Sequence, residues 1–98
     1  MNGRSKFEQM MDILLRCEVL PAEGMEPNLT NIIWSARLNY RTAKTLLTEL
    51  VSLEALRYEG KRFLLTEKGE EALQAYHHII HELQEPQSRV YIKVVNVS

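Results

Sequence analysis

The sequence predicts an α+β fold that is mainly α-helical and forms a single domain. Apolar residues recur at helical spacing in four segments, whereas residues 56–65 alternate apolar and polar side chains as a β-hairpin does. The chain has 98 residues, 45% of them hydrophobic, which is enough for one core and too little for two. We therefore expect three helices, a two-stranded hairpin and a longer fourth helix.

The first two helices are predicted from capping and periodicity. Ser5 and Glu8 have the S-x-x-E spacing of a capping box, and Phe7 begins an apolar stripe that indicates a helix over about residues 6–18. We expect it to end before "LPAEGMEPN", because two prolines and a glycine disfavour a helix. A second helix, "LTNIIWSARL", restarts near Asn28 or Thr30, and we expect its Trp34 to lie in the core.

The third helix, from Tyr40 to about Leu53, has two different faces. Asn39 precedes it and can cap it through its side-chain oxygen. Its apolar stripe consists of Ala43, Leu46, Leu47 and Leu50. The opposite stripe, free of acids, consists of Arg41, Lys44, Thr45 and Thr48. The pattern alone leaves this polar stripe as either a solvated surface or a binding surface.

The hairpin is followed by the longest helix and a tail. "ALRYEGKRFLLT" places a turn at residues 59–61 between two short strands. Thr66 is predicted to cap a helix over 67–84, which would be about 27 Å long. Pro86 is expected to end this helix. The segment "RVYIKVVNV" is rich in β-branched residues, which predicts a strand. We therefore divide the chain into a domain over residues 1–84 and a tail over 85–98.

The charge is weakly acidic overall but unevenly distributed. The formal net charge is −1, whereas a strongly basic chain would indicate nucleic-acid binding by itself. Residues 37–68 hold seven Lys and Arg against four Asp and Glu, a net charge of +3, while the segments on either side each have a net charge of −2. The positive charge is therefore concentrated around the third helix and the hairpin.

Several functional classes are disfavoured. The chain contains no phosphate-binding loop, dinucleotide-binding fingerprint or paired-cysteine motif, so we expect no enzymatic activity and no cofactor. Cys17 falls in an apolar helical pattern and is predicted to be a core residue. No apolar run is long enough to span a membrane, and the N-terminus lacks a secretion signal, which predicts a cytoplasmic protein.

Three histidines, His77, His78 and His81, cluster near the end of the last helix. His77 and His81 are spaced to share a metal ion, but two imidazoles make a weak site without a third ligand, so no metal site is predicted. The cluster instead predicts a surface that responds to acid, and self-association that depends on histidine protonation is our hypothesis.

Two stretches, "NYRTAKTLLTELVSLEAL" and "GKRFLLTEKGEEAL", resemble the archaeal winged helix-turn-helix DNA-binding regulators. In that family the second strand of the wing runs into T-x-K-G, supplied here by Thr66, Lys68 and Gly69, and then into a long C-terminal helix. The resemblance covers about residues 5–84 and implies three helices, a two-stranded wing and the long helix. The glycine that usually follows the recognition helix is absent, because "LEAL" stands in its place, and the tail lies outside the resemblance.

The resemblance implies a DNA-binding transcriptional regulator. The recognition helix, about residues 40–53, would enter the major groove, and the wing, about 56–65, would contact the backbone or the minor groove. Arg41 is the first candidate for base recognition because guanidinium can bond both acceptors of guanine, while Lys44 suits a base or a phosphate. The candidate DNA-binding residues are Arg37, Arg41, Thr42, Lys44, Thr45, Thr48, Lys61 and Arg62.

The predicted partners are double-stranded DNA, a second copy of the chain and no membrane. Family members with a long last helix commonly dimerise through it, and the residues here would be Tyr76, Ile79, Ile80 and Leu83. The apolar tail would pair with the partner chain or a different protein. The alternative function is a winged-helix protein-interaction module that does not bind DNA, and salt-dependent DNA affinity discriminates between the two.

Overall fold

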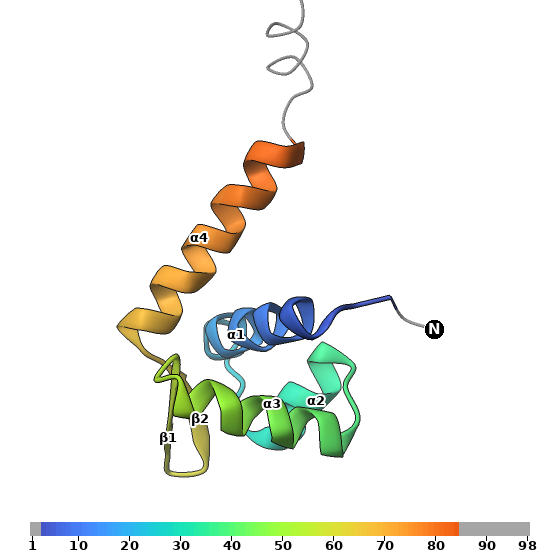
Figure 1. The fold of residues 1–98 in the computed structure, drawn as a ribbon. Helices are drawn as coiled ribbons and strands as arrows, with labels where there is room; N and C mark the ends of the chain where they lie inside the picture. Colours follow the sequence, from blue (N-terminus) through green and yellow to red (C-terminus); the bar gives the residue numbers. More distant parts are fainter. Residues whose placement is uncertain (1–2, 85–98) are drawn as a thin grey trace, which may run out of the picture.

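The computed structural model describes residues 3–84, which form four helices and one two-stranded antiparallel sheet (Figure 1). In chain order the elements are α1 (Lys6–Ala22), α2 (Leu29–Ala36), α3 (Tyr40–Ser52), β1 (Leu56–Glu59), β2 (Arg62–Leu65) and α4 (Glu67–Gln84). This order is that of a winged helix-turn-helix domain with a long C-terminal helix, as the sequence predicts. The strand predicted within residues 85–98 lies outside the described residues.

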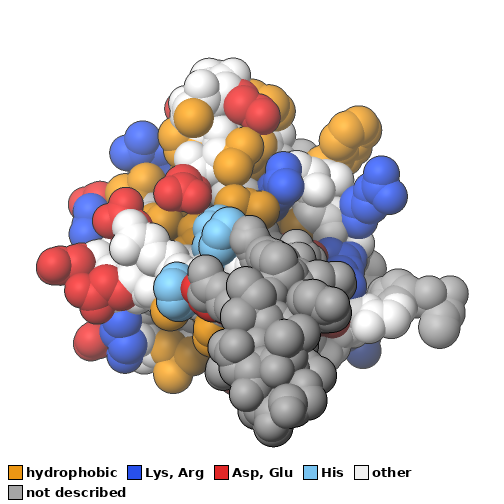
Figure 2. Space-filling model, turned by 90° about the horizontal axis from the view of Figure 1, so that it is seen from above, with side chains coloured by type: hydrophobic (Ala, Val, Ile, Leu, Met, Phe, Trp, Pro, Cys, Tyr) orange, Lys and Arg blue, Asp and Glu red, His pale blue; other side chains and the backbone are white. Residues whose placement is uncertain are grey.

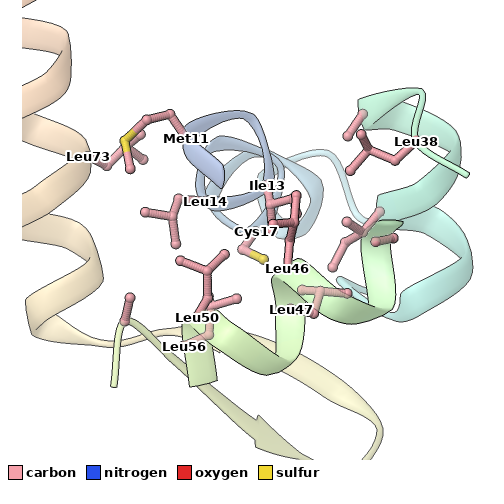
Figure 3. Packing of buried hydrophobic residues seen from close by; sticks show 14 of the residues in the cluster. Met11, Ile13, Leu14, Cys17, Leu38, Leu46, Leu47, Leu50, Leu56 and Leu73 are labelled. Carbon is pink, nitrogen blue, oxygen red and sulfur yellow. The ribbon is translucent and has the colours of Figure 1, made fainter. Parts of the chain in front are cut away.

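The core lies between α1, α2 and α3 and extends to the first half of α4. Ile13, Leu14, Ile32 and Leu47 are at most 1% exposed. Leu73 brings α4 into the same cluster, where Figure 3 shows it beside Met11 of α1. Burying a leucine or isoleucine fully contributes roughly 1.5–3 kcal/mol, so this cluster fixes α3 against the rest of the domain.

The three predicted helix caps form, and Asn28 caps α2 as well. Ser5 and Glu8 make the reciprocal capping box, with the Glu8 carboxylate accepting from the Ser5 backbone N–H at 2.9 Å. The Asn28 and Asn39 side-chain oxygens accept from the amides of Asn31 and Thr42, at 2.8 and 2.7 Å. Thr66 Oγ1 accepts from the Gly69 amide at 3.0 Å. Each cap satisfies a backbone donor that has no partner inside its own helix.

Helix α1 is longer than predicted, because it continues through Pro21 to Ala22. The expectation that the helix would end before this proline was wrong. The last turn buries Leu20 in the core, and this packing offsets the cost of a proline in the turn. Gly24 ends the helix instead: it adopts φ 79°, and the Met25 amide donates to the Leu20 carbonyl at 2.9 Å.

Trp34 is not a core residue, contrary to the prediction, since 80% of its surface is exposed. The buried positions of α2 are Ile32 and Ala36, four residues apart on one face. Trp34 lies two residues from each of them, about 200° around the helix, and therefore points outward.

Helix α3 ends without a glycine by placing Glu54 in the left-handed region, at φ 65°. The Ala55 amide donates to the Leu50 carbonyl and the Glu54 amide to the Val51 carbonyl, both at 2.9 Å. These two bonds form a Schellman motif, which normally has glycine at the position of Glu54. The chain thus keeps the usual helix end at the cost of backbone strain.

Gly69, the glycine of the T-x-K-G element, is required by close packing. A β-carbon added there would overlap the carbonyl oxygen of Ala55. Thr66 Oγ1 donates to the Glu54 carbonyl at 2.6 Å, and the Thr66 amide donates to the Ala55 carbonyl at 3.2 Å. The first turn of α4 is therefore held directly against the segment that leaves α3.

The wing is a hairpin with a two-residue turn, Gly60 and Lys61, at φ 59° and 64°. Glu59, predicted as part of the turn, pairs instead with Arg62 across the strands. Two positive φ values in a two-residue turn are typical of type I′, which matches the twist of the strands. The Phe63 amide donates to the Pro27 carbonyl at 2.9 Å, which attaches β2 to the loop before α2.

Candidate nucleic-acid interface

Helix α3 has the two faces that the sequence predicts. Figure 3 shows Leu46, Leu47 and Leu50 pointing from α3 into the hydrophobic cluster, and each is at most 3% exposed. The opposite stripe is exposed and consists of Arg41, Lys44, Thr45 and Thr48. We call these four residues the α3 outer stripe. The core fixes which side of α3 is available to a partner.

The two cations of the α3 outer stripe are not engaged by acids. Within residues 3–84, no carboxylate forms an ion pair with Arg41 or Lys44. The Lys44 ammonium lies 5.6 Å from the centroid of the Tyr40 ring, a weak cation–π contact at an exposed site. Both cations therefore remain available for an anionic partner.

Tyr40 belongs to this surface, although the sequence analysis did not select it. It is 58% exposed at the first position of α3, one turn before Lys44. The i, i+4 spacing of an aromatic residue and a lysine was the available signal. Tyr40 restrains the Lys44 side chain and adds an exposed aromatic ring at the start of the stripe.

Thr42 differs from the other predicted contact residues because it is half-buried. Its backbone amide is bound by the Asn39 cap at 2.7 Å. Thr45 and Thr48 are exposed. The structure therefore separates Thr42 from the α3 outer stripe.

The acidic residue of α3 is turned away from this stripe. Glu49 is half-buried and pairs with Lys6 of α1, with 3.1 Å between the ammonium nitrogen and the carboxylate oxygen. An exposed carboxylate beside Lys44 would repel phosphate, so the pairing with α1 keeps the outer side of α3 free of negative charge.

The wing places Lys61 and Arg62 at and beside its turn. Lys61 is exposed in the turn itself. Arg62 lies 3.9 Å from Glu26 of the loop before α2, and both side chains are largely exposed, at 46% and 64%. An exposed ion pair of this length contributes little, so Arg62 can exchange Glu26 for another anion at small cost.

Arg37 occupies the connection between α2 and α3, where it adopts φ 55° and is exposed. Its carbonyl and that of Ala36 accept hydrogen bonds from the Arg4 guanidinium at 2.9 and 2.8 Å. Arg4 also pairs with Asp12 at 2.7 Å. Arg4 thereby neutralises the C-terminal end of α2 and holds the turn that orients α3. Sequence reasoning missed this role, because 32 residues separate Arg4 from Ala36.

Helix α4 projects away from the other elements (Figure 1) and carries the predicted dimerisation residues. Tyr76 is half-buried and packs edge-on against Phe7 of α1, with 5.7 Å between the ring centroids. Ile80 is also half-buried. Ile79 and Leu83 are 54% and 77% exposed. Of the four predicted residues, Tyr76 therefore contacts the chain's own domain, whereas Ile79 and Leu83 are exposed apolar side chains.

The three histidines are exposed along α4. Figure 2, seen from above the view of Figure 1, shows histidine side chains with hydrophobic side chains beside them. Within residues 3–84, no group of three His, Cys, Asp or Glu side chains is arranged to hold a metal ion. No helix in this part of the chain is long and apolar enough to cross a membrane.

The fold and the exposed face of α3 define a winged helix-turn-helix domain. The family model described as winged helix-turn-helix matches residues 3–84, and the chain belongs to this family. Among solved structures, it is similar to Sso10a-2, described as a DNA-binding protein from Sulfolobus solfataricus. The two share 30% sequence identity over 96% of each chain, with a TM-score of 0.65. No curated protein sequence matches the chain.

Proposed function

We propose that this protein is a DNA-binding transcriptional regulator that inserts α3 into the major groove. The observation that carries the proposal is the α3 outer stripe, which is exposed, donor-rich and free of carboxylates on a helix whose other face is fully buried. Membership of the winged helix-turn-helix family and the similarity to a DNA-binding archaeal protein support it. In this class the protein binds DNA rather than catalysing a reaction, and we propose a cytoplasmic location.

The side chains of α3 suit the major groove. The groove is about 12 Å wide and admits one helix, with base contacts made mainly from its N-terminal part. Arg41, in the first turn, is placed to bond both acceptors of a guanine. Lys44 suits a base or a phosphate, and Thr45 and Thr48 suit a phosphate oxygen or a thymine methyl group. Thr42 is a weaker candidate because it is half-buried.

The wing and the helix-turn-helix connection would position the domain on the backbone. Lys61 and Arg62 would contact phosphate or the minor groove, with Arg62 leaving Glu26 to do so. Arg37 would add a further phosphate contact beside the N-terminus of α3. None of these contacts distinguishes one base from another, so they would set affinity and register rather than sequence.

We further propose a homodimer formed through α4. Positions 72, 76, 79 and 83 follow the 4, 3, 4 spacing of a coiled-coil stripe, and Ile79 and Leu83 are exposed on it. A two-fold dimer would present two α3 helices to half-sites about 34 Å apart or a multiple of that spacing. The apolar tail would contact the partner chain or another protein.

The test is a salt titration of binding to mixed-sequence duplex DNA with the full chain and the Arg41→Ala, Lys44→Ala double variant. Each phosphate contact contributes about 0.9 to the slope of log affinity against log salt concentration. We expect salt-sensitive binding by the wild type, and a large loss of affinity in the double variant. The slope should fall by up to about 1.8 if both residues contact phosphate.

The matched control is the pair of single variants Lys44→Ala and Lys68→Ala. Both remove one exposed lysine, but Lys68 lies in the first turn of α4, outside the α3 outer stripe. If the two variants lost DNA affinity equally, the loss would be explained by net charge alone, and the role assigned to α3 would be refuted.

A protein-interaction module is the second candidate, favoured by Trp34, which is 80% exposed on α2. A large exposed aromatic side chain is enriched at protein interfaces and costs solubility elsewhere. Absence of DNA binding by the wild type at low salt would select this function in place of the first.

A further inference from the structure

A groove of about 450 Å³ lies between α3 and the wing. Its floor is apolar and includes Leu47, Val51 and Phe63. Lys44, Thr48 and Tyr58, which carry polar groups, also line it. The volume lies within the range of roughly 300–1,000 Å³ that small-molecule sites occupy, and such sites combine an apolar lining with a few polar groups.

The lining has a definite chemical character. Tyr58 and Phe63 face each other across the two strands, with 4.6 Å between their ring centroids, and form an aromatic wall on the wing side. Lys44 is the single charged residue of the lining, and no carboxylate contributes to it. The side chains therefore complement a flat apolar group that carries one negative charge.

We propose that this groove binds a small amphipathic anion, an aromatic ring system bearing one carboxylate. The ring would lie against Val51 and the aromatic wall, and the carboxylate would accept from the Lys44 ammonium and the Thr48 hydroxyl. Lys44 would leave only the weak contact with the Tyr40 ring to do so. A phosphodiester backbone is a poorer occupant, because Lys44 could pair with one phosphate but the backbone has no flat apolar group to cover Val51 and the aromatic wall.

A ligand in this groove would also affect DNA binding, and this part of the proposal rests on the proposed function. Lys44 and Thr48 belong both to this groove and to the α3 outer stripe. An anion held on Lys44 would neutralise one of the two cations of the stripe and occupy a hydroxyl that DNA would use. The ligand would therefore compete with DNA, whereas its binding to the groove does not require that DNA binds at all.

The experiment is an amide chemical-shift titration of the full chain with 2-naphthoate, without DNA. We expect saturable shifts at Val51, Tyr58 and Phe63. The uncharged 2-naphthalenemethanol should bind more weakly by up to about five-fold, which is the upper end of the effect of one exposed ion pair. Lys44→Met should weaken naphthoate binding by a similar factor, while Lys68→Met should leave it at the wild-type value.

A second variant tests whether naphthoate occupies the groove or only binds to the positive charge of Lys44 at the surface. Ser52 is exposed and also lines the groove, so Ser52→Trp should fill the groove without disturbing the core. Wild-type affinity for naphthoate in this variant, equal affinity for the alcohol, or no saturable shift in the wild type would each overturn the proposal.

The regulatory part is tested by DNA affinity in naphthoate against acetate at the same ionic strength. Weaker DNA binding in naphthoate is expected, and unchanged binding would overturn competition. If naphthoate binds in the groove while DNA does not bind at all, the groove is a ligand site and the proposed function is wrong. If DNA binds and naphthoate does not, while Tyr58→Phe lowers DNA affinity, the groove belongs to the DNA surface and the ligand proposal fails.

Discussion

Replacing Glu54 with glycine should stabilise the domain, because Glu54 holds the left-handed position that ends α3. Its φ of 65° is a conformation that glycine adopts without strain and that other residues adopt at a cost. The Glu54 side chain is exposed, and the hydrogen bonds at this helix end use backbone atoms of Glu54 and Ala55. The substitution therefore removes strain without removing a contact that holds the helix end.

The expected gain follows from two opposing quantities. A left-handed residue with a β-carbon costs about 1–2 kcal/mol relative to glycine. Glycine loses more conformational freedom on folding, which offsets about 0.4–1 kcal/mol. The net stabilisation should be about 0.5–1 kcal/mol, which raises the melting temperature of a domain of this size by about 2–8 °C.

Thermal and urea unfolding of Glu54→Gly measure this gain, with Glu54→Ala as the matched control. The alanine variant removes the carboxylate but keeps the β-carbon, so it should show no comparable gain. Equal stabilisation in both variants would assign the effect to charge at the helix end and refute the strain argument. Destabilisation by glycine would show that Glu54 does not adopt the left-handed conformation.

Three further predictions follow from packing and burial. Gly69→Ala should lower the free energy of unfolding by about 1–3 kcal/mol in urea titrations, because the added β-carbon would overlap the Ala55 carbonyl. This loss is expected although alanine favours helices over glycine. Gly3 has open space around it, so Gly3→Ala should leave the stability unchanged. Burial raises the pKa of the Cys17 thiol from 9.0 to about 12. Between these pH values the thiol is ionised in the unfolded chain but stays protonated in the folded one. The free energy of unfolding should therefore fall by up to about 1.4 kcal/mol per pH unit as the pH rises. Unfolding curves at pH 8 to 11 should show this extra loss in the wild type and not in Cys17→Ala, and equal slopes would contradict it. Leu83→Glu should convert a dimer to a monomer in sedimentation equilibrium while Gln74→Glu, also exposed on α4, should not; a monomeric wild type would refute pairing through α4.

Local signals were sufficient to predict the order of the elements. Side-chain caps at Ser5, Asn39 and Thr66 act within three residues, so the sequence contains both partners of each bond. The apolar stripe of α3 is long and regular, which fixed its buried side and therefore its exposed side as well.

The wrong predictions, for Trp34 and for the end of α1, arose where the periodic pattern was short or where the contacting residue lay far away in the sequence. Helix α2 has eight residues, and its consecutive Ile32, Ile33 and Trp34 leave the buried side ambiguous, so Trp34 was assigned to the wrong face. The extension of α1 through Pro21 depends on tertiary burial of Leu20. The groove between α3 and the wing arises from packing between separate elements, which periodicity does not reveal.

The candidate DNA-binding residues were also predicted in part from local sequence patterns and in part missed. The sequence identified the exposed cations of α3 because they belong to its regular polar stripe. It did not show that Glu49 pairs with Lys6, that Glu26 lies beside Arg62, or that Thr42 is half-buried. These details determine which predicted residues are available to DNA, and they depend on contacts between separate elements.

The proposed function requires the outer side of α3 and the wing turn to contact DNA. The most direct measurement is the map of backbone amide shifts in the full chain on titration with duplex DNA at low salt. We expect shifts concentrated in residues 40–48 and 60–62, with residues 8–18 of α1 unaffected. Shifts concentrated around Trp34 on α2, or no shifts at all, would contradict it.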